Sequence, residues 1–157
     1  MSNTIVVGIS DQQVVAPPDT LITYALGSCV GICLHDGFLR VAGLSHILLP
    51  SAPDGKNQTD IYKYADTAIE AMLRTMERKG CSRYRITAKI AGGATMFTTN
   101  GISIGERNIE MVKRELERLR IRLLAEDTGL NYGRTVDFNP ETGTMTVKSV
   151  GRGIKTL

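Results

Sequence analysis

The sequence predicts an α+β fold, in which two helices pack against sheets built mostly from strands that are neighbours in the chain. Two windows carry apolar residues at spacings of three and four, which is typical of amphipathic helices. Several shorter runs alternate apolar and polar residues or are rich in β-branched types, which is typical of strands. The expected order is strands, helix, strand, helix, strands. A length of 157 residues suits one domain, expected over residues 1–157.

The composition excludes several classes of protein. Apolar residues make up 42% of the chain and charged residues 22%, which is typical of a globular protein. The net charge of +3 is small, and no basic cluster with interleaved aromatic residues indicates a nucleic-acid partner. Three cysteines favour reduced thiols over a disulfide framework. The first ten residues do not resemble a signal peptide, and no apolar run is long enough to cross a bilayer. We therefore expect a cytoplasmic protein that does not insert into membranes.

The beginning of the chain is predicted to form strands. Residues 4–9 are rich in β-branched types, and residues 12–15 read as a short continuation. Pro17 and Pro18 cannot donate to a ladder, so pairing is expected to stop there. Residues 21–26 then lead into a hairpin.

The hairpin is predicted from two alternating runs at residues 30–35 and 39–44. Between them stand an aspartate and a glycine, at residues 36–37, among the strongest signals for a two-residue turn. Such a turn would pair His35 with Phe38.

That register would bring Cys29 and His46 together. Cys29 would face Leu44, and His46 would lie one diagonal step away on the same face of the sheet. Diagonal neighbours have Cβ atoms roughly 7 to 8 Å apart or somewhat less, a gap that a thiol and an imidazole largely close. The sequence therefore predicts that Cys29 and His46 are partners.

Two helices are predicted in the second half of the chain. The first should run from about residue 60 to residue 79, with Thr59 as N-cap and Gly80 as the terminating residue. The second should begin near Ser103, whose spacing from Glu106 fits a capping box. Their expected buried stripes are Ile61, Ala65, Ala68, Met72 and Met76 in the first helix, and Ile109, Val112, Leu116 and Leu119 in the second.

The remaining segments are predicted as strands and loops. The loop at residues 50–59 is either a rim over the site or a plain connector. Gly92 and Gly93 suit either a bulge or one wall of a cleft. Asn131 and Arg134, before the last two strands, either bind substrate or hold their own loop together. Further strands are expected at residues 84–90, 121–125, 135–139 and 144–150.

A paired cysteine and histidine favour nucleophilic catalysis. The thiolate of Cys29 is the expected nucleophile, and His46 would take its proton or lower its pKa. Thr23, the nearest hydroxyl of matching strand parity, would orient the imidazole. Gly27 and Ser28 form a turn of small residues, and their N–H groups are candidates to receive an oxyanion.

Other interpretations of these residues stay open. A cysteine in an alternating run is usually a small buried hydrophobe, and a histidine near a strand end is usually a hydrogen-bonded surface group. A zinc site is disfavoured because Cys33 lies four positions from Cys29, about 13 Å along a strand at roughly 3.4 Å per residue. His35 is further away still. We therefore expect no metal ion and no other cofactor.

Five blocks of sequence resemble one known family. They are LGSCV at residues 26–30, GLSHILLP at 43–50, KIAGGATMF at 89–97, IGERN at 104–108 and DTGLNYGR at 127–134. Together they resemble the chemoreceptor glutamine deamidases of the CheD family over nearly the whole chain. One departure is Leu130, which stands where that family commonly has a second glycine.

The resemblance implies a catalytic cysteine, histidine and threonine at Cys29, His46 and Thr23. It also implies the layered helix, sheet, sheet arrangement shared with the cytotoxic necrotising factor deamidase toxins. The implied reaction converts glutamine side chains of chemoreceptors to glutamate in bacterial chemotaxis. The same attack would also hydrolyse a receptor methyl ester, because only the leaving group differs.

The family implies a second partner besides the receptors, the phosphatase CheC. Phe97 is a candidate docking anchor because it lies in a polar loop, with burial against the sheet as the alternative. The alternative function is a non-enzymatic regulatory module that docks on CheC or on receptor helices, with Cys29 vestigial.

Overall fold

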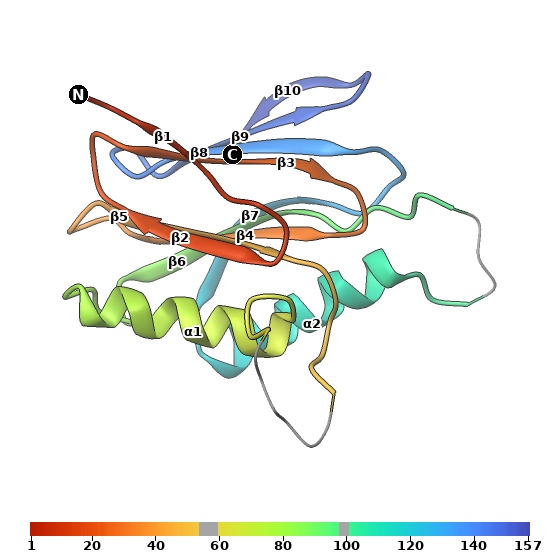
Figure 1. Cartoon of the computed structure of the whole chain (residues 1–157), viewed down its shortest axis with the longest axis horizontal. Helices are drawn as coiled ribbons and strands as arrows, with labels where there is room; N and C mark the ends of the chain where they lie inside the picture. Colours follow the sequence, from red (N-terminus) through yellow and green to blue (C-terminus); the bar gives the residue numbers. More distant parts are fainter. Residues whose placement is uncertain (54–59, 98–100) are drawn as a thin grey trace.

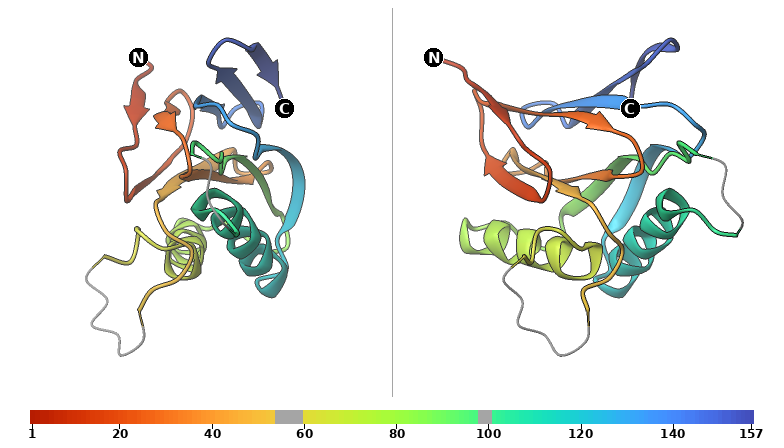
Figure 2. Two further views of the ribbon diagram at one scale, coloured as in Figure 1. Left: turned by 90° about the vertical axis from the view of Figure 1, so that its right-hand side faces the viewer. Right: turned by 45° about the vertical axis from the view of Figure 1, so that its right-hand side comes forward.

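The computed structural model describes residues 1–53, 60–97 and 101–157. Two five-stranded sheets face each other, and helices cover the far side of one of them (Figure 1). We call the sheet between the helices and the other sheet the central sheet, and the remaining one the outer sheet. The α+β class, with two helices over layered sheets, is confirmed (Figure 2).

The outer sheet has the strand order β1-β3-β8-β9-β10. β1 pairs with β3 in parallel, and the other neighbours are antiparallel. The predicted closing hairpin is present as β8 and β9. β10 was not predicted, since all four of its residues are exposed and carry no apolar periodicity. The strands are β1 (Thr4–Val6), β3 (Thr20–Leu26), β8 (Arg134–Asn139), β9 (Thr144–Ser149) and β10 (Gly153–Thr156).

The central sheet has the order β2-β5-β4-β6-β7. The prediction that residues 12–15 continue the first strand is wrong, because β2 lies in the other sheet and pairs with β5. Ser10, with a left-handed φ of 59°, lies where the chain passes between the sheets. β6 and β7 confirm two predicted strands, each ending further along than expected. The strands are β2 (Asp11–Val15), β4 (Val30–Asp36), β5 (Val41–Ile47), β6 (Ile86–Gly92) and β7 (Arg122–Thr128).

β4 and β5 form the predicted hairpin with a different turn. Residues 37–40 all lie in the loop, and His35 pairs with Ala42 instead of Phe38. Asp36 ends β4, and its carboxylate accepts N–H bonds from Phe38 and the residue after it. The predicted register is therefore wrong by four positions. Because four is even, every side chain keeps its predicted face of the sheet.

α1 (Ala65–Arg78) begins later than predicted. Tyr64 is its N-cap and makes no side-chain capping bond, while Thr59, the expected cap, lies outside the described residues. The end is as expected, since Gly80 adopts a left-handed φ of 96°. Met72 and the other apolar residues of α1 pack on the central sheet.

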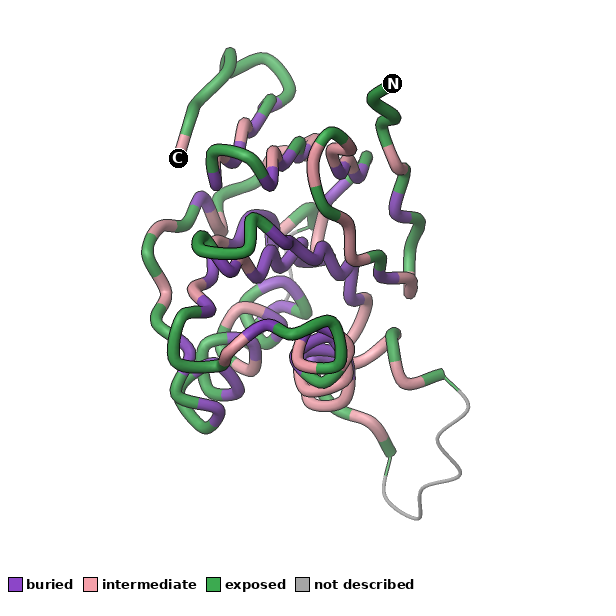
Figure 3. The backbone as a smooth tube through the Cα atoms, turned by 90° about the vertical axis from the view of Figure 1, so that its left-hand side faces the viewer, coloured by how far each residue is buried: buried purple, intermediate pink, exposed green. Residues whose placement is uncertain are grey.

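α2 (Ile104–Arg118) begins as predicted, because Ser103 accepts a hydrogen bond from the N–H of Glu106. Its stripe packs against the same face of the central sheet as α1. A second apolar cluster fills the space between the two sheets. Among the residues that the structure describes, no helix is long and apolar enough to span a bilayer. Figure 3 shows that burial is concentrated in the central sheet, between these two apolar layers.

Candidate active site

The passage from β3 to β4 leads from the outer sheet, where Thr23 lies, to the central sheet, just before which Cys29 lies. β3 belongs to the outer sheet, and its pairing with β8 is irregular between Thr23 and Leu26. Ala25 has a left-handed φ of 57°, and residues 27–29 form a bend before β4 begins in the central sheet (Figure 1). The two side chains therefore do not share one strand. The parity argument for Thr23 is wrong, although the residue that it selected does lie beside His46.

His46 lies on β5 and faces the outer sheet. It pairs with Asp11 on one side and Gly31 on the other, so its backbone is held by two neighbouring strands. Ala42 and Leu44, which share its face of β5, pack in the cluster between the sheets. The imidazole is only 1% exposed.

A hydrogen-bond chain fixes the tautomer of His46. Oγ1 of Thr23 lies 2.7 Å from the carbonyl oxygen of Val7 and 2.7 Å from Nδ1 of His46. A carbonyl only accepts, so the single hydroxyl proton of Thr23 goes to Val7. Nδ1 of His46 must then donate to the hydroxyl, which leaves Nε2 without a proton. Nε2 is buried and has no hydrogen-bond partner among the described residues, so its lone pair is available as a base.

Burial keeps both candidate groups, the Cys29 thiol and the His46 imidazole, neutral. It lowers the pKa of His46 to about 4. It also raises the pKa of the Cys29 thiol, an effect that the backbone N–H of Cys29 partly offsets. The resting site therefore holds a thiol and a neutral imidazole, and the thiolate forms only when a proton moves.

Cys29 lies at the end of the ladder that holds His46. Gly31, two positions further on, pairs directly with His46, so Cys29 is one diagonal step from the histidine. Cys29 and Cys33 both belong to the apolar cluster between the sheets, which is the layer that His46 faces. Cys29 is 7% exposed, whereas Cys33 is fully buried.

The two glycines at the end of β6, Gly92 and Gly93, hold the loop that carries Cys29. The N–H of Gly93 donates to the carbonyl of Cys29, and the N–H of Ala94 donates to the carbonyl of Gly27, at 2.8 and 2.9 Å. A Cβ on Gly92 would lie 2.3 Å from the carbonyl oxygen of Cys29. The backbone can approach this closely only because Gly92 has no side chain.

Asn108 is a residue of the site that the sequence analysis missed. Its amide is fully buried at the start of α2, and Nδ2 donates to the carbonyls of Ser28 at 2.8 Å and Leu48 at 3.1 Å. One side chain therefore ties the Cys29 loop to the segment that follows His46. The available signal was its position four residues before Val112, which puts a polar side chain on the buried face of the helix.

Fewer of the predicted backbone N–H groups are free to donate a hydrogen bond to an oxyanion. The N–H of Gly27 already donates to the carbonyl of Ala25 at 3.1 Å. The N–H of Ser28 donates no hydrogen bond within the part of the chain that the structure describes, and the N–H of Cys29 lies against its own sulfur. Ser28 and Cys29 are therefore the donors that could face a substrate oxygen.

A cavity of about 200 Å³ opens beside Ser28. Met96 and Phe97 contribute its apolar wall, and hydroxyl groups come from Thr95 and Ser103. Phe97 is 81% exposed, so the alternative that it is buried against the sheet is wrong. A substrate side chain that reached Cys29 from this side would pass an apolar surface with a few polar groups.

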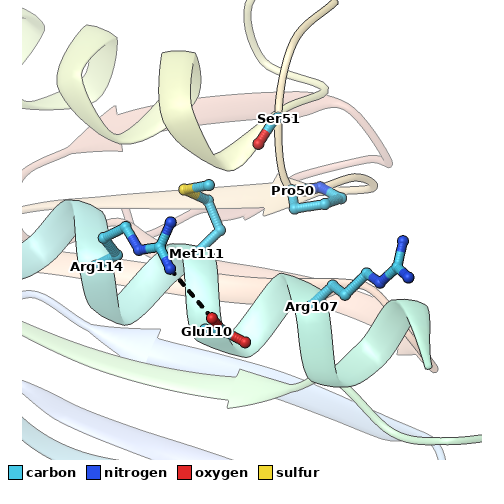
Figure 4. A pocket seen from close by; sticks show the side chains of 6 residues that line it. All are labelled: Pro50, Ser51, Arg107, Glu110, Met111 and Arg114. Atoms are coloured by element: carbon cyan, nitrogen blue, oxygen red, sulfur yellow. Dashed lines mark hydrogen bonds and ion pairs between the residues drawn. The ribbon is translucent and has the colours of Figure 1, made fainter. Parts of the chain in front are cut away.

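A second cavity, of about 180 Å³, lies along the outer face of α2 (Figure 4). Pro50 and Ser51 cover it from the segment after β5, while Arg114 is paired with Glu110 at 3.1 Å. The described start of the predicted rim loop therefore packs along the helix, and residues 54–59 lie outside the described residues.

The other candidate residues lie elsewhere. Nε2 of His35 bonds to the carbonyl of Pro140, at the opposite end of β4 from Cys29. Arg134 is 1% exposed and donates to the carbonyl of Gly129 at 3.0 Å, which confirms that it holds its loop. Asn131 is exposed in that loop. In residues 1–53, 60–97 and 101–157, no group of three or more His, Cys, Asp and Glu side chains is arranged to hold a metal ion.

Comparison with known proteins gives consistent matches. A family model described as CheD chemotactic sensory transduction matches residues 48–149. A protein of Syntrophomonas wolfei named "Probable chemoreceptor glutamine deamidase CheD" is 49% identical over 157 residues, covering 98% of each chain. A protein of Halalkalibacterium halodurans named "Chemoreceptor glutamine deamidase CheD" is 45% identical over 162 residues, covering 100% of each chain. One of Thermotoga maritima with the same name is 44% identical over 149 residues, covering 94% of this chain and 93% of its own.

Proposed function

This chain belongs to the CheD family of chemotactic sensory transduction proteins, and from that premise we infer that it is a chemoreceptor glutamine deamidase. Such an enzyme hydrolyses the side-chain amide of glutamine in a chemoreceptor and leaves glutamate and ammonia. It is therefore a protein-glutamine glutaminase that acts in chemotaxis.

We propose that Cys29, His46 and Thr23 carry the reaction. Nε2 of His46 removes the thiol proton as the sulfur of Cys29 attacks the amide carbon, so that a C–S bond forms and the amide oxygen becomes an oxyanion. The N–H groups of Ser28 and Cys29 donate to that oxygen. Thr23 holds Nδ1 throughout and stabilises the imidazolium through its hydroxyl oxygen.

The second half of the reaction reverses these roles. The imidazolium of His46 gives its proton to the amide nitrogen, the C–N bond breaks and ammonia leaves. Water then attacks the thioester and loses a proton to His46. The C–S bond breaks, the carboxyl group is released and Cys29 recovers its proton. General acid–base catalysis of this kind contributes typically about 10²- to 10⁴-fold in rate.

The observation that carries this proposal is the 2.7 Å contact between Thr23 and Nδ1 of His46, combined with an unpartnered Nε2. A histidine with only a packing role would not need one nitrogen fixed as donor while the other is left without a partner in a buried site. The buried, unpartnered acceptor is stabilised only when a proton donor such as a thiol or an ammonia group reaches it.

The test is incubation of the protein with cytoplasmic fragments of a chemoreceptor. Mass spectrometry should show glutamine converted to glutamate at individual sites, with matching release of ammonia. Cys29→Ala and His46→Gln should abolish both signals. Cys81→Ala is the matched control, because Cys81 is equally buried but follows α1, away from the site. Methanol release from methylated fragments would show whether esters are also cleaved.

The partners are also part of the proposal. We infer that receptor helices approach over the cavity beside Ser28, and that exposed Phe97 is an anchor for them or for the phosphatase CheC. A cytoplasmic location fits substrates of this kind. Binding of CheC or receptor fragments that is unaffected by Cys29→Ala, without any deamidation by the unmodified protein, would favour the non-enzymatic regulatory module.

The layered arrangement also supports the implied kinship with the cytotoxic necrotising factor deamidase toxins. The order of helices, central sheet and outer sheet, with the nucleophile at one end between the sheets, is the basis of that inference. Superposition of the cysteine, histidine and both sheets on such a toxin is the test.

A further inference from the structure

A hollow rich in arginine lies at the end of the central sheet away from Cys29. It has a volume of about 600 Å³, and Ile86 and Leu119 form its buried floor. β6 runs from Ile86 in this hollow to Gly92 beside the Cys29 loop, about 20 Å at roughly 3.3 Å per residue. The hollow is therefore separate from the candidate active site. Its rim carries Arg83, Arg118, Arg120 and Arg122.

Two of these arginines are already neutralised. Arg83 makes a bidentate contact with Glu77, in which Nε and Nη2 donate to the two carboxylate oxygens at 3.0 and 3.3 Å. Arg118 bonds to Glu70 at 2.6 Å and to Glu115 at 2.8 Å. No carboxylate is among the described residues that line the hollow. The glutamates that neutralise Arg83 and Arg118 therefore lie outside it.

The positive charges of the other two arginines are not neutralised by any described carboxylate. Arg120 and Arg122 are exposed, and neither forms an ion pair with any residue that the structure describes. The hydroxyl side chains of Tyr84 and Thr87 add hydrogen-bonding groups to the same rim.

Arg120 has a backbone conformation that is unfavourable for a residue with a side chain. Both helices end in the same way: the residue after the left-handed one donates its N–H to a carbonyl five positions back. In α1 the left-handed residue is Gly80, with φ 96°, the usual choice there. In α2 it is Arg120, with φ 59°, although a side chain costs conformational energy in this region.

The end of a helix does not account for the whole cluster. Positively charged side chains are favourable near a helix C-terminus, and this explains the two arginines at the end of α2. Arg83 comes from the turn before β6, and Arg122 comes from β7. Three segments therefore direct guanidinium groups to one concave site, whose volume lies within the range of about 300 to 1,000 Å³ typical of small-molecule pockets.

We propose that this hollow binds a small ligand that carries two or more phosphate groups. A guanidinium group donates two parallel hydrogen bonds to phosphate oxygens, and two unpaired guanidinium groups match two phosphates. A concave site with an apolar floor suits such a ligand better than an extended acidic chain.

The experiment is calorimetric titration of the full-length protein with inorganic pyrophosphate at low ionic strength. Binding is expected, and added salt should weaken it. Arg120→Gly and Arg122→Gln should each raise the dissociation constant by about tenfold or more, as expected for loss of a charge-assisted contact. Arg114→Gln is the matched control, since Arg114 is an exposed arginine of α2 that is paired with Glu110 outside the hollow.

The choice of variant keeps the result interpretable. Arg120→Gly places at the end of α2 the residue that already ends α1, so the variant should fold and keep its melting temperature. Deamidase activity should also be unchanged, which separates this proposal from the assigned reaction. The absence of pyrophosphate binding, or equal binding by all variants, would overturn the proposal. So would tighter binding of an oligoglutamate peptide, which would mark the hollow as a docking surface for an acidic protein.

Discussion

The hydroxyl of Thr23, in the outer sheet, lies 2.7 Å from Nδ1 of His46, in the central sheet. The contact spans the apolar layer between the sheets and is completed by the carbonyl of Val7, which takes the hydroxyl proton. It determines that Nδ1 of His46 carries the proton and that Nε2 does not. The relative position of the two sheets therefore sets the tautomer of this histidine.

Thr23→Val should show whether Thr23 orients the His46 imidazole or only packs against it. Valine has nearly the shape of threonine and lacks the hydroxyl. It leaves the Val7 carbonyl and the Nδ1 proton without partners, at a cost of about 1 to 3 kcal/mol for each buried group. The turnover of receptor fragments should fall by about 10²-fold, at the lower end of the contribution from acid–base catalysis. Thr23→Ser, which keeps the hydroxyl, should restore most of the rate. Equal rates for both variants would contradict the orienting role.

Alkylation should distinguish the three cysteines. Burial raises the pKa of Cys29, raises that of Cys81 to about 11, and raises that of fully buried Cys33 furthest. Iodoacetamide should therefore modify Cys29 first, Cys81 more slowly and Cys33 only after unfolding. The rate at Cys29 should keep rising above neutral pH, because the resting pair is uncharged. Peptide mapping over a pH series measures this, and a plateau from pH 6 upward would indicate an ion pair instead.

His46 should make the protein sensitive to acid. Its folded-state pKa is about 4, against an ordinary value of 6.5, so the unfolded chain binds the extra proton first. Its contribution to stability is complete above pH 6.5 and is lost as the pH falls towards 4, by about 3 kcal/mol at roughly 1.4 kcal/mol per pH unit. Urea unfolding of the unmodified protein and of His46→Gln should therefore differ in slope between these limits.

Asn108→Ala should impair the reaction without removing a reacting group. The variant frees the carbonyls of Ser28 and Leu48, and a buried unsatisfied carbonyl costs about 1 to 3 kcal/mol. We expect lower stability by about that amount and a kcat that falls more than the KM changes, because the donors beside Cys29 shift. Asn108→Asp should be no better, since its carboxylate would face two carbonyl oxygens. Normal kinetics in both variants would show that α2 merely packs there.

The sequence predicted the faces of the central hairpin better than its turn. Alternation alone determined which side chains point towards the outer sheet, and the slip of four positions preserved that assignment. The turn itself depends on long-range contacts. Arg85 and the N–H of Ser82, far along the chain, bind the carboxylate of Asp36 and hold it at the strand end. A local turn signal cannot contain that information.

The site was less predictable than the fold, for a similar reason. Thr23 reaches His46 only because the chain changes sheets after β3, which no periodicity in residues 21–26 reveals. Asn108 contacts residues 60 and 80 positions away, so its role follows from helix placement. The face of His46 was predictable because β4 and β5 form one hairpin, where strand parity applies, and Cys29 immediately precedes β4.

The number of residues between β3 and β4 is fixed by the position that Cys29 must reach. Residues 24–28 must leave one sheet, turn and deliver Cys29 to the position just before Val30, the first ladder residue of the other sheet. An inserted or deleted residue there would rotate the thiol away while both sheets kept their pairing. Loop-length variants of this segment should thus fold yet be inert, whereas the exposed connection between β9 and β10 should accept changes in length freely.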